Sequence, residues 1–205
     1  MRVEAREVSR SFGSQKVIDS LSLDIDSGER MAIVGGNGSG KTTFLRLLSG
    51  ILSPTSGKIL WEDPSGEEVA RELWPQKMCF TGPYVELIEE LSMIELLHFH
   101  QKMRPYIADL GPLDLLKISG LEHAQNKLIK YFSSGMKQRL RLTLAVMSRS
   151  SVVFLDEPTS NFDQRAIDWM RELIENYLGN RTLVVGTNSV QSELLLCNRT
   201  KSVAP

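Results

Sequence analysis

The stretch "RMAIVGGNGSGKTTFLRLLSG", residues 30–50, decides the fold class of this chain. Its first five residues form an apolar run that predicts a buried strand, and its last ten have the spacing of a helix that ends in glycine. Between them, "GGNGSGKT" matches the phosphate-binding pattern G-x-x-x-x-G-K-[ST]. An incidental glycine-rich turn would not be expected to have a strand pattern before it, a helix pattern after it and the complete phosphate-binding pattern between them. The stretch therefore predicts a phosphate-loop nucleotide-binding core.

The phosphate loop predicts how a nucleotide would be held. Its glycines allow the backbone to wrap a phosphate with N–H groups. We expect Lys41 to reach the β- and γ-phosphates and the Thr42 hydroxyl to bind Mg²⁺. The expected nucleotide-binding residues of the loop are Gly35, Asn37, Gly38, Ser39, Gly40, Lys41, Thr42 and Thr43.

A second motif, "SVVFLDEP" at residues 151–158, places two carboxylates after a β-branched apolar run. The run predicts a buried strand, and open α/β sheets bind ligands at the carboxyl ends of their strands. We expect Asp156 to bind Mg²⁺ and Glu157 to polarise the attacking water. The alternative is a solvated corner between strand and loop, which the presence of the phosphate loop disfavours.

The remaining pattern predicts one domain over residues 1–205. Most of the segment from about 85 to 149 has helical spacing, and strand patterns flank it on both sides. This order predicts an α/β phosphate-loop NTPase core with a mainly parallel sheet, an N-terminal antiparallel β portion and an inserted helical subdomain at about 85–149. Further strands are predicted at 21–26, 58–61, 77–81 and 181–187, and a helix at 165–179.

Composition places limits on function. The chain is 41% hydrophobic and 24% charged, which is ordinary for a globular protein. Its net charge of −1 gives no general electrostatic reason to bind nucleic acid. Cys79 and Cys197 form no ligand cluster, which favours a reducing compartment. The chain start has no secretory pattern, and no apolar run reaches the roughly 18 residues of a membrane span, so a membrane role would require a partner.

A third motif, "KYFSSGMKQRLRLTLAVM" at residues 130–147, predicts a second anion site. A Ser-Ser-Gly loop opens a helix with a basic start, where free N–H groups and the helix dipole attract negative charge. The alternative is an ordinary helix N-cap, for which serine is favoured.

Three motifs together, "GGNGSGKTT", "FSSGMKQR" and "VVFLDEPTSNFD", resemble the ATP-binding subunits of ABC transporters, and the short chain is similar to their compact exporter type. The resemblance covers nearly the whole chain. It implies ATP and Mg²⁺ as cofactors and a homodimer or heterodimer of ATPase domains packed head to tail. It also implies a separate transmembrane permease, no nucleic-acid partner and a peripheral position on the cytoplasmic face of the membrane.

The resemblance also implies why one chain has two anion sites. In the family, the signature loop "LSGGQ" of one subunit caps the γ-phosphate of ATP on the other subunit. The matching signature loop here is Phe132–Met136. Ser133 and Gly135 are retained, and the resemblance implies that they contact the nucleotide of the other subunit. Ser134 and Met136 depart from the family's glycine and glutamine.

Two further positions follow from the resemblance. Phe12 lies where the family has an aromatic residue that stacks on adenine, although a core phenylalanine is the rival interpretation. Asp163 matches the loop that communicates across the dimer, but it is equally suited to be the N-cap of the following helix.

Two departures from the family affect the predicted mechanism. The glutamine expected after the strand at 77–81 is missing, and Gln76 lies too early to replace it. Asn188 occupies the position of a histidine that contacts the γ-phosphate, and an amide can donate there but cannot titrate. The predicted catalytic residues are Glu157, Lys41 and Asn188, with slow turnover.

The predicted function is that of an ATP-hydrolysing motor subunit which drives transport through a separate membrane subunit. A soluble ABC ATPase acting on nucleic acid or ribosomes is the alternative. Such proteins usually carry two ATPase domains, coiled-coil insertions or basic arms, and this sequence shows none of them. A nucleotide kinase is disfavoured by the signature loop and by "LDEPTS" at residues 155–160.

Overall fold

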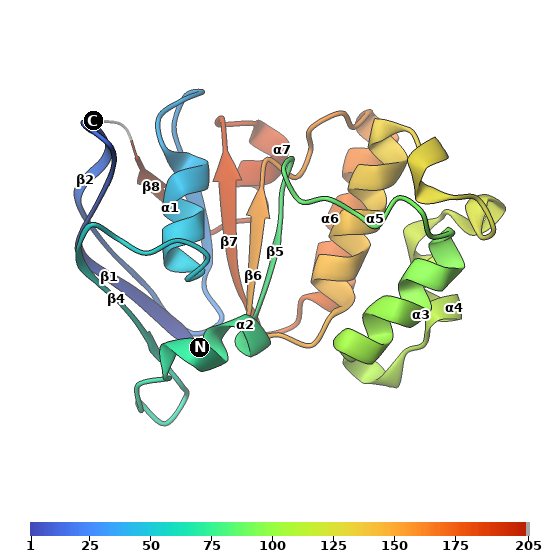
Figure 1. The fold of residues 1–205 in the computed structure, drawn as a ribbon, viewed down its shortest axis with the longest axis horizontal. Coiled ribbons are helices and arrows are strands. Elements are labelled where there is room, and N and C mark those ends of the chain that lie inside the picture. The colour runs from blue at the N-terminus through green and yellow to red at the C-terminus, as the bar shows by residue number, and fades with distance from the viewer. Residues whose placement is uncertain (204–205) are drawn as a thin grey trace. The chain divides into compact units, whose positions relative to one another are not determined.

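The computed structural model describes residues 1–203, which form two compact units (Figure 1). Each unit is built from segments that are separate in the sequence. The first comprises Met1–Phe80, Ser150–Glu157 and the chain from Asn180 onward; the second comprises Thr81–Arg149 and Pro158–Gly179. The second unit begins near the start of the predicted helical subdomain, and it also includes the segment that follows Glu157.

A five-stranded sheet has the strand order β5-β6-β7-β3-β8. Strand β7 pairs in parallel with β6 and β3, and β3 pairs in parallel with β8. Every residue of β6 and β7 is buried, which explains their continuous apolar sequences. The strands are β3 (Arg30–Val34), β5 (Met78–Thr81), β6 (Val152–Asp156), β7 (Thr182–Thr187) and β8 (Arg199–Ser202).

A three-stranded antiparallel sheet lies in the first unit, with the order β2-β1-β4. Its strands are β1 (Arg2–Phe12), β2 (Gln15–Ile25) and β4 (Ser56–Glu62). A two-residue turn joins β1 to β2, and Gly13 adopts a φ of 59° there. Register shifts interrupt β1 between Ala5 and Ser11. They break the two-residue alternation, so the sequence pattern does not predict a strand over residues 2–12.

The core of the first unit packs helix α1 (Lys41–Leu48) with residues of both sheets. Phe44, Leu45, Leu47 and Leu48 are fully buried in this cluster. The Trp61 indole N–H donates to the carbonyl of Leu48 at 3.0 Å, which satisfies a polar group that burial would otherwise leave unpaired. The remaining helical segments of this unit are the 3₁₀ turn η1 (Arg71–Leu73), α2 (Trp74–Lys77) and α7 (Gln191–Leu194).

The second unit is helical. Ser92 begins its first helix with a capping box that includes Glu95, and Gly120 ends α4 with a φ of 65°. The α-helices are α3 (Met93–Met103), α4 (Pro112–Ser119), α5 (Ser134–Met147) and α6 (Gln164–Tyr177). The 3₁₀ turns are η2 (Ile107–Asp109), η3 (Glu122–Ala124) and η4 (Ile129–Tyr131). Within residues 1–203, no helix combines the length and apolar character needed to cross a bilayer.

Candidate nucleotide-binding site

The phosphate loop lies between the end of β3 and the start of α1, and neighbouring atoms leave little room for a side chain at two of its glycines. Gly40 has a φ of 96°, and a Cβ at this position would lie 2.9 Å from Cδ1 of Ile18 and 3.1 Å from the carbonyl oxygen of Val17. A Cβ on Gly35 would lie 2.4 Å from the Ser39 hydroxyl oxygen. Gly40 therefore requires glycine and lies against strand β2, whereas a side chain at position 35 would displace the Ser39 hydroxyl.

Lys41 is buried at the start of α1, with only 4% of its surface exposed. Its ammonium group donates to the carbonyl of Gly36 at 2.8 Å and lies 3.9 Å from Oε1 of Glu157. A buried cation with these two oxygen partners places positive charge beside the loop's backbone N–H groups. The two features together make an anion site of the kind that binds phosphate.

Asp156 and Thr42 meet although 114 positions separate them in the sequence. The Thr42 hydroxyl donates to Oδ2 of Asp156 at 2.6 Å. Burial raises the pKa of the Asp156 carboxyl above its ordinary value, and the hydrogen bond from Thr42 opposes this rise. Among the described residues, Oδ1 of Asp156 has no hydrogen-bond partner. A buried, half-satisfied carboxylate beside a hydroxyl fits the oxygen ligands of a hard divalent cation such as Mg²⁺.

Gly186 makes room for this carboxylate, and the sequence interpretation missed it. A Cβ on Gly186 would lie 2.8 Å from Oδ1 of Asp156 and 3.1 Å from Cδ2 of Leu45. The signal was present as a glycine inside the β-branched run "LVVGT", because glycine in a strand interior often marks a close approach.

Glu157 and Asn188 lie beside the phosphate loop. The Asn188 amide nitrogen donates to Oδ1 of Asn37 at 2.7 Å and to Oε1 of Glu157 at 3.1 Å. An amide nitrogen carries two hydrogens, so it makes both bonds at once. Glu157 has a φ of 45°, and its backbone N–H donates to the carbonyl of Gly186 at 2.9 Å. The structure therefore brings together Asn37, Lys41, Glu157 and Asn188.

Phe12 is not a core residue, which removes the rival interpretation of this position. It is the last residue of β1, and 47% of its surface is exposed. The guanidinium carbon of Arg10 lies over its ring, 4.5 Å from the centroid. Because Gly40 contacts β2, the partner strand of β1, the hairpin that carries Phe12 packs against the phosphate loop.

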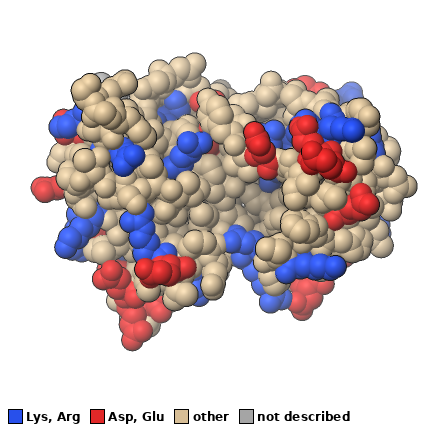
Figure 2. Space-filling view, in the orientation of Figure 1, with Lys and Arg blue, Asp and Glu red and all other residues tan. Residues whose placement is uncertain are grey.

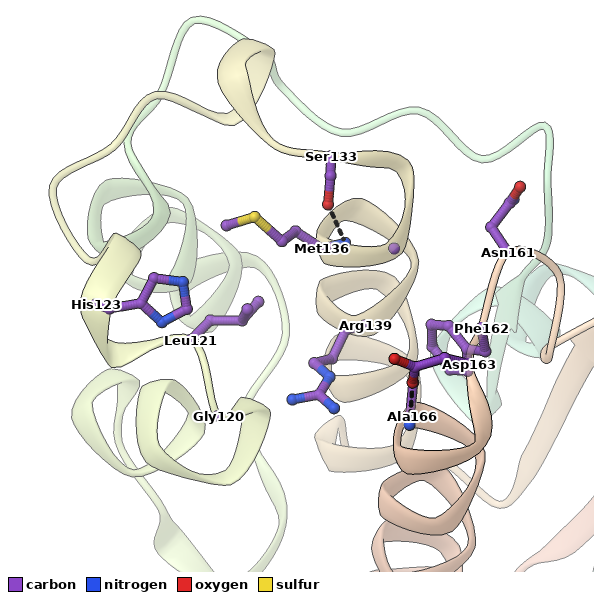
Figure 3. Close-up of a pocket in the computed structure, with 11 residues that line it drawn as sticks. Gly120, Leu121, His123, Ser133, Met136, Arg139, Asn161, Phe162, Asp163 and Ala166 are labelled. Atoms are coloured by element: carbon purple, nitrogen blue, oxygen red, sulfur yellow. Dashed lines mark hydrogen bonds between the residues drawn. The ribbon is translucent and has the colours of Figure 1, made fainter.

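The signature loop lies in the second unit, at the start of α5. The Ser133 hydroxyl accepts from the Met136 N–H at 3.2 Å, so the predicted N-cap is present. A pocket of about 310 Å³ borders this loop (Figure 3). Met136 and His123 lie on one side of the pocket, and the loop with Asn161 and Asp163 lies on the other. A Cβ on Gly135 would lie 3.7 Å from the Asn161 carbonyl, an ordinary contact.

Other predicted positions have local partners. Asp163 caps α6 by accepting from the Ala166 N–H at 2.8 Å. Gln76 lies in α2, before β5 begins. Of the histidines, His98 and His100 lie on α3, and burial lowers the pKa of His100 to about 4.

The face shown in Figure 2 carries basic and acidic side chains interspersed, without a dominant sign.

The fold and the phosphate loop define a phosphate-loop nucleotide-binding domain. A family model described as "ABC transporter" matches residues 18–160. The lantibiotic transport ATP-binding protein SrtF of Streptococcus pyogenes is 29% identical over 197 residues, covering 94% of this chain and 82% of the relative. The bacitracin transport ATP-binding protein BcrA of Bacillus licheniformis is 31% identical over 195 residues, which cover 91% of this chain and 61% of the relative.

Solved structures agree with this assignment at the level of the fold. A dimeric bacterial ABC transporter cassette superposes with a TM-score of 0.82 at 21% identity, covering 98% of this chain and 93% of the other. A dimeric ATP-binding cassette bound to ADP and phosphate gives a TM-score of 0.81, with the same identity and coverage.

The chain belongs to the ABC transporter family. The predicted α/β fold of an ABC ATPase is confirmed. The predicted class, an ATPase subunit of an ABC transporter, is also confirmed and is favoured over a soluble ABC ATPase that acts on nucleic acid or ribosomes.

Proposed function

We propose that this chain binds Mg²⁺ and ATP at the phosphate loop and hydrolyses the ATP to drive transport through a separate membrane subunit. The observation that carries the proposal is the cluster around this loop. A buried lysine, a hydroxyl–carboxylate pair and a second carboxylate held by an amide all converge there, from β3, α1 and the ends of β6 and β7. Phosphoryl transfer needs positioning and charge stabilisation more than covalent chemistry, and these groups supply both.

Each group has a proposed role. Lys41 and the backbone N–H groups of the loop bind the β- and γ-phosphates. Thr42 and Asp156 hold Mg²⁺, which when bound neutralises charge on the phosphates. Glu157 accepts a proton from the attacking water, whose oxygen then bonds to the γ-phosphorus as ADP leaves. Asn188 orients the Glu157 carboxylate through its 3.1 Å hydrogen bond.

We assign the signature loop to a second nucleotide, bound by a partner chain. The start of α5 offers backbone N–H groups and the positive end of a 14-residue helix, which favour an anion. A head-to-tail dimer of ATPase domains, with like or unlike partners, would bring Ser133 and Gly135 against the ATP of the other subunit. The dimeric form of the related cassettes supports this arrangement.

Transport also requires a path through the membrane. We assign that path to a separate transmembrane permease, with this chain peripheral on the cytoplasmic side. The support is the description of two relatives as transport ATP-binding proteins. The proposal includes no nucleic-acid partner.

Removing Lys41 tests the proposed site directly. We expect Lys41→Ala to abolish Mg²⁺–ATP binding measured by isothermal titration calorimetry, because the buried cation beside the loop is lost. The control is Lys58→Ala, an exposed lysine on β4 with the same charge change. Equal ATP affinity in wild type and Lys41→Ala would contradict the assignment.

A further inference from the structure

The β1–β2 hairpin ends in an exposed aromatic ring with a guanidinium group over one face. The Arg10 guanidinium lies 4.5 Å from the Phe12 centroid, and 47% of the Phe12 surface is exposed. A cation over one face of a ring leaves the opposite face for another planar group. Resting on the proposed ATP site, we propose that Arg10 is a positioning residue: it fixes the Phe12 ring as a platform for the adenine base.

Arg10 is itself anchored. Its Nη1 donates to the carbonyl of Ser53 at 3.0 Å. The strand residues on both sides of Arg10 are tied to the same segment, because Thr55 N–H donates to the Ser9 carbonyl at 2.8 Å and Ser11 N–H donates to the Thr55 hydroxyl at 3.1 Å. The guanidinium is therefore held over the ring by a segment 43 positions away in the sequence.

Few other groups compete with the Phe12 ring for the Arg10 guanidinium. Nε of Arg10 is buried and has no hydrogen-bond partner within residues 1–203. Within residues 1–203 the Arg10 side chain forms no ion pair, and its guanidinium interacts with the Ser53 carbonyl and the Phe12 ring. Arg6, on the same strand, differs because its Nε and Nη2 both donate to the Glu4 carboxylate, at 2.7 and 2.9 Å.

The platform is connected to the phosphate site. Phe12 pairs with Gln15 at the turn, and Arg10 pairs with Ile18 on β2. Ile18 and Val17 are the residues that approach Gly40 of the phosphate loop. A ring fixed on this hairpin would lose little freedom on binding a base, and such preorganisation raises affinity without adding contacts. Stacking tolerates any base, so the role predicts affinity for the base and not selectivity among bases.

The test compares Mg²⁺–ATP with Mg²⁺–tripolyphosphate, which has the phosphates without the base, by isothermal titration calorimetry. Phe12→Ala should weaken ATP binding about fivefold or more and leave tripolyphosphate unchanged. Arg10→Ala should weaken ATP binding about threefold, again without effect on tripolyphosphate, and Arg10→Lys should restore part of this loss. The double variant should bind ATP no more weakly than Phe12→Ala alone. Arg6→Ala is the matched control on β1 and should change neither ligand.

Two results would overturn the inference. Equal weakening of ATP and tripolyphosphate in Arg10→Ala would place Arg10 in phosphate binding or in folding. Independent losses in the double variant would show that Arg10 does not act through the ring. A failure of the proposed function would look different. In that case Lys41→Ala would not weaken the binding of either ligand relative to wild type.

Discussion

The two predicted anion sites of this chain differ in how much of a binding site each supplies. The phosphate loop in the first unit has a buried cation, a buried carboxylate–hydroxyl pair and two glycines at which a Cβ would lie within 3.0 Å of a neighbouring atom. The signature loop in the second unit has a serine N-cap, and a Cβ on its Gly135 would meet only an ordinary contact, at 3.7 Å. Lys137, in the first turn of α5, already pairs with Glu89.

This difference indicates which loop can act alone. The phosphate loop carries its own countercharge and metal ligands, so it can bind a nucleotide within one chain. The signature loop offers backbone N–H groups and a helix dipole, and the interaction of a charge with an exposed helix dipole is worth about 0.3–1 kcal/mol. A contact of that size stabilises a phosphate that is already bound elsewhere. The difference between the two loops therefore favours a nucleotide site shared by two chains.

The largest expected effect concerns the phosphate-loop half. Glu157→Gln keeps the shape of the side chain, and the new amide oxygen can still accept the hydrogen bond from Asn188. The substitution removes the carboxylate that accepts a proton from water. We expect turnover to fall about 10²–10⁴-fold while ATP binding is retained. Phosphate release and calorimetry measure the two quantities. The retained ATP should trap a dimer on gel filtration, and near-normal turnover would place the general base elsewhere.

The second prediction tests whether the signature loop acts on the partner's nucleotide. Lys41→Ala damages the phosphate loop, and Gly135→Asp places a negative charge at the start of α5, where the pocket leaves room for a side chain. Each homodimer then has two defective sites. A mixed dimer has one site with both lesions and one intact site, so mixing should restore measurable ATP hydrolysis.

The controls for mixing are each variant alone and the demonstration of subunit exchange. A signature loop that served its own chain would give no intact site in any combination. A mixture as inactive as its parents, with exchange established, would therefore contradict the shared site and leave the phosphate-loop assignment standing.

The third prediction concerns the buried Asp156. Burial raises the pKa of Asp156, so the folded state favours the protonated carboxyl over the ionised one. The stability of the folded state therefore falls as the pH rises from the ordinary pKa of aspartate to the raised pKa of Asp156, because the buried carboxyl ionises over this range. Asp156→Asn removes this charge. We expect its nucleotide-free thermal midpoint at pH 7 to be no lower than that of wild type, while the Mg²⁺ dependence of ATP binding is lost.

Thermal unfolding with and without Mg²⁺–ATP checks both parts of that expectation. Asp163→Asn is the control, since Asp163 is an exposed helix cap outside the phosphate loop and asparagine also caps helices. Full Mg²⁺ dependence in Asp156→Asn would exclude Asp156 as the metal ligand.

The same comparison explains which features the sequence could predict. The phosphate loop, Asp156 and Glu157 follow from local patterns, because a strand, a glycine-rich loop and a helix are encoded by neighbouring residues. Strand β1 was not assigned, because its bulges break the alternation. The contacts of Arg10 with Ser53 and of Asn188 with Asn37 join residues 43 and 151 positions apart, so no local pattern reports them.

The smallest expected effect concerns Asn188, which bridges Asn37 and Glu157 at the phosphate loop. Asn188→His supplies a group that can carry positive charge near the γ-phosphate, and we expect turnover to rise a few-fold at a pH below about 6.5, where imidazole is charged. Above that pH the gain should disappear, because neutral imidazole has one N–H and cannot keep both of the bonds that the amide makes. Wild type should show no such acid-side change from this position, since an amide does not titrate.

Phosphate release measured from pH 5.5 to 8.5 separates the cases, with Asn188→Ala as the control that removes both bonds. A lower rate for the histidine variant at every pH would mean that the bridge to Asn37 and Glu157 matters more than charge, and that this site depends on the amide.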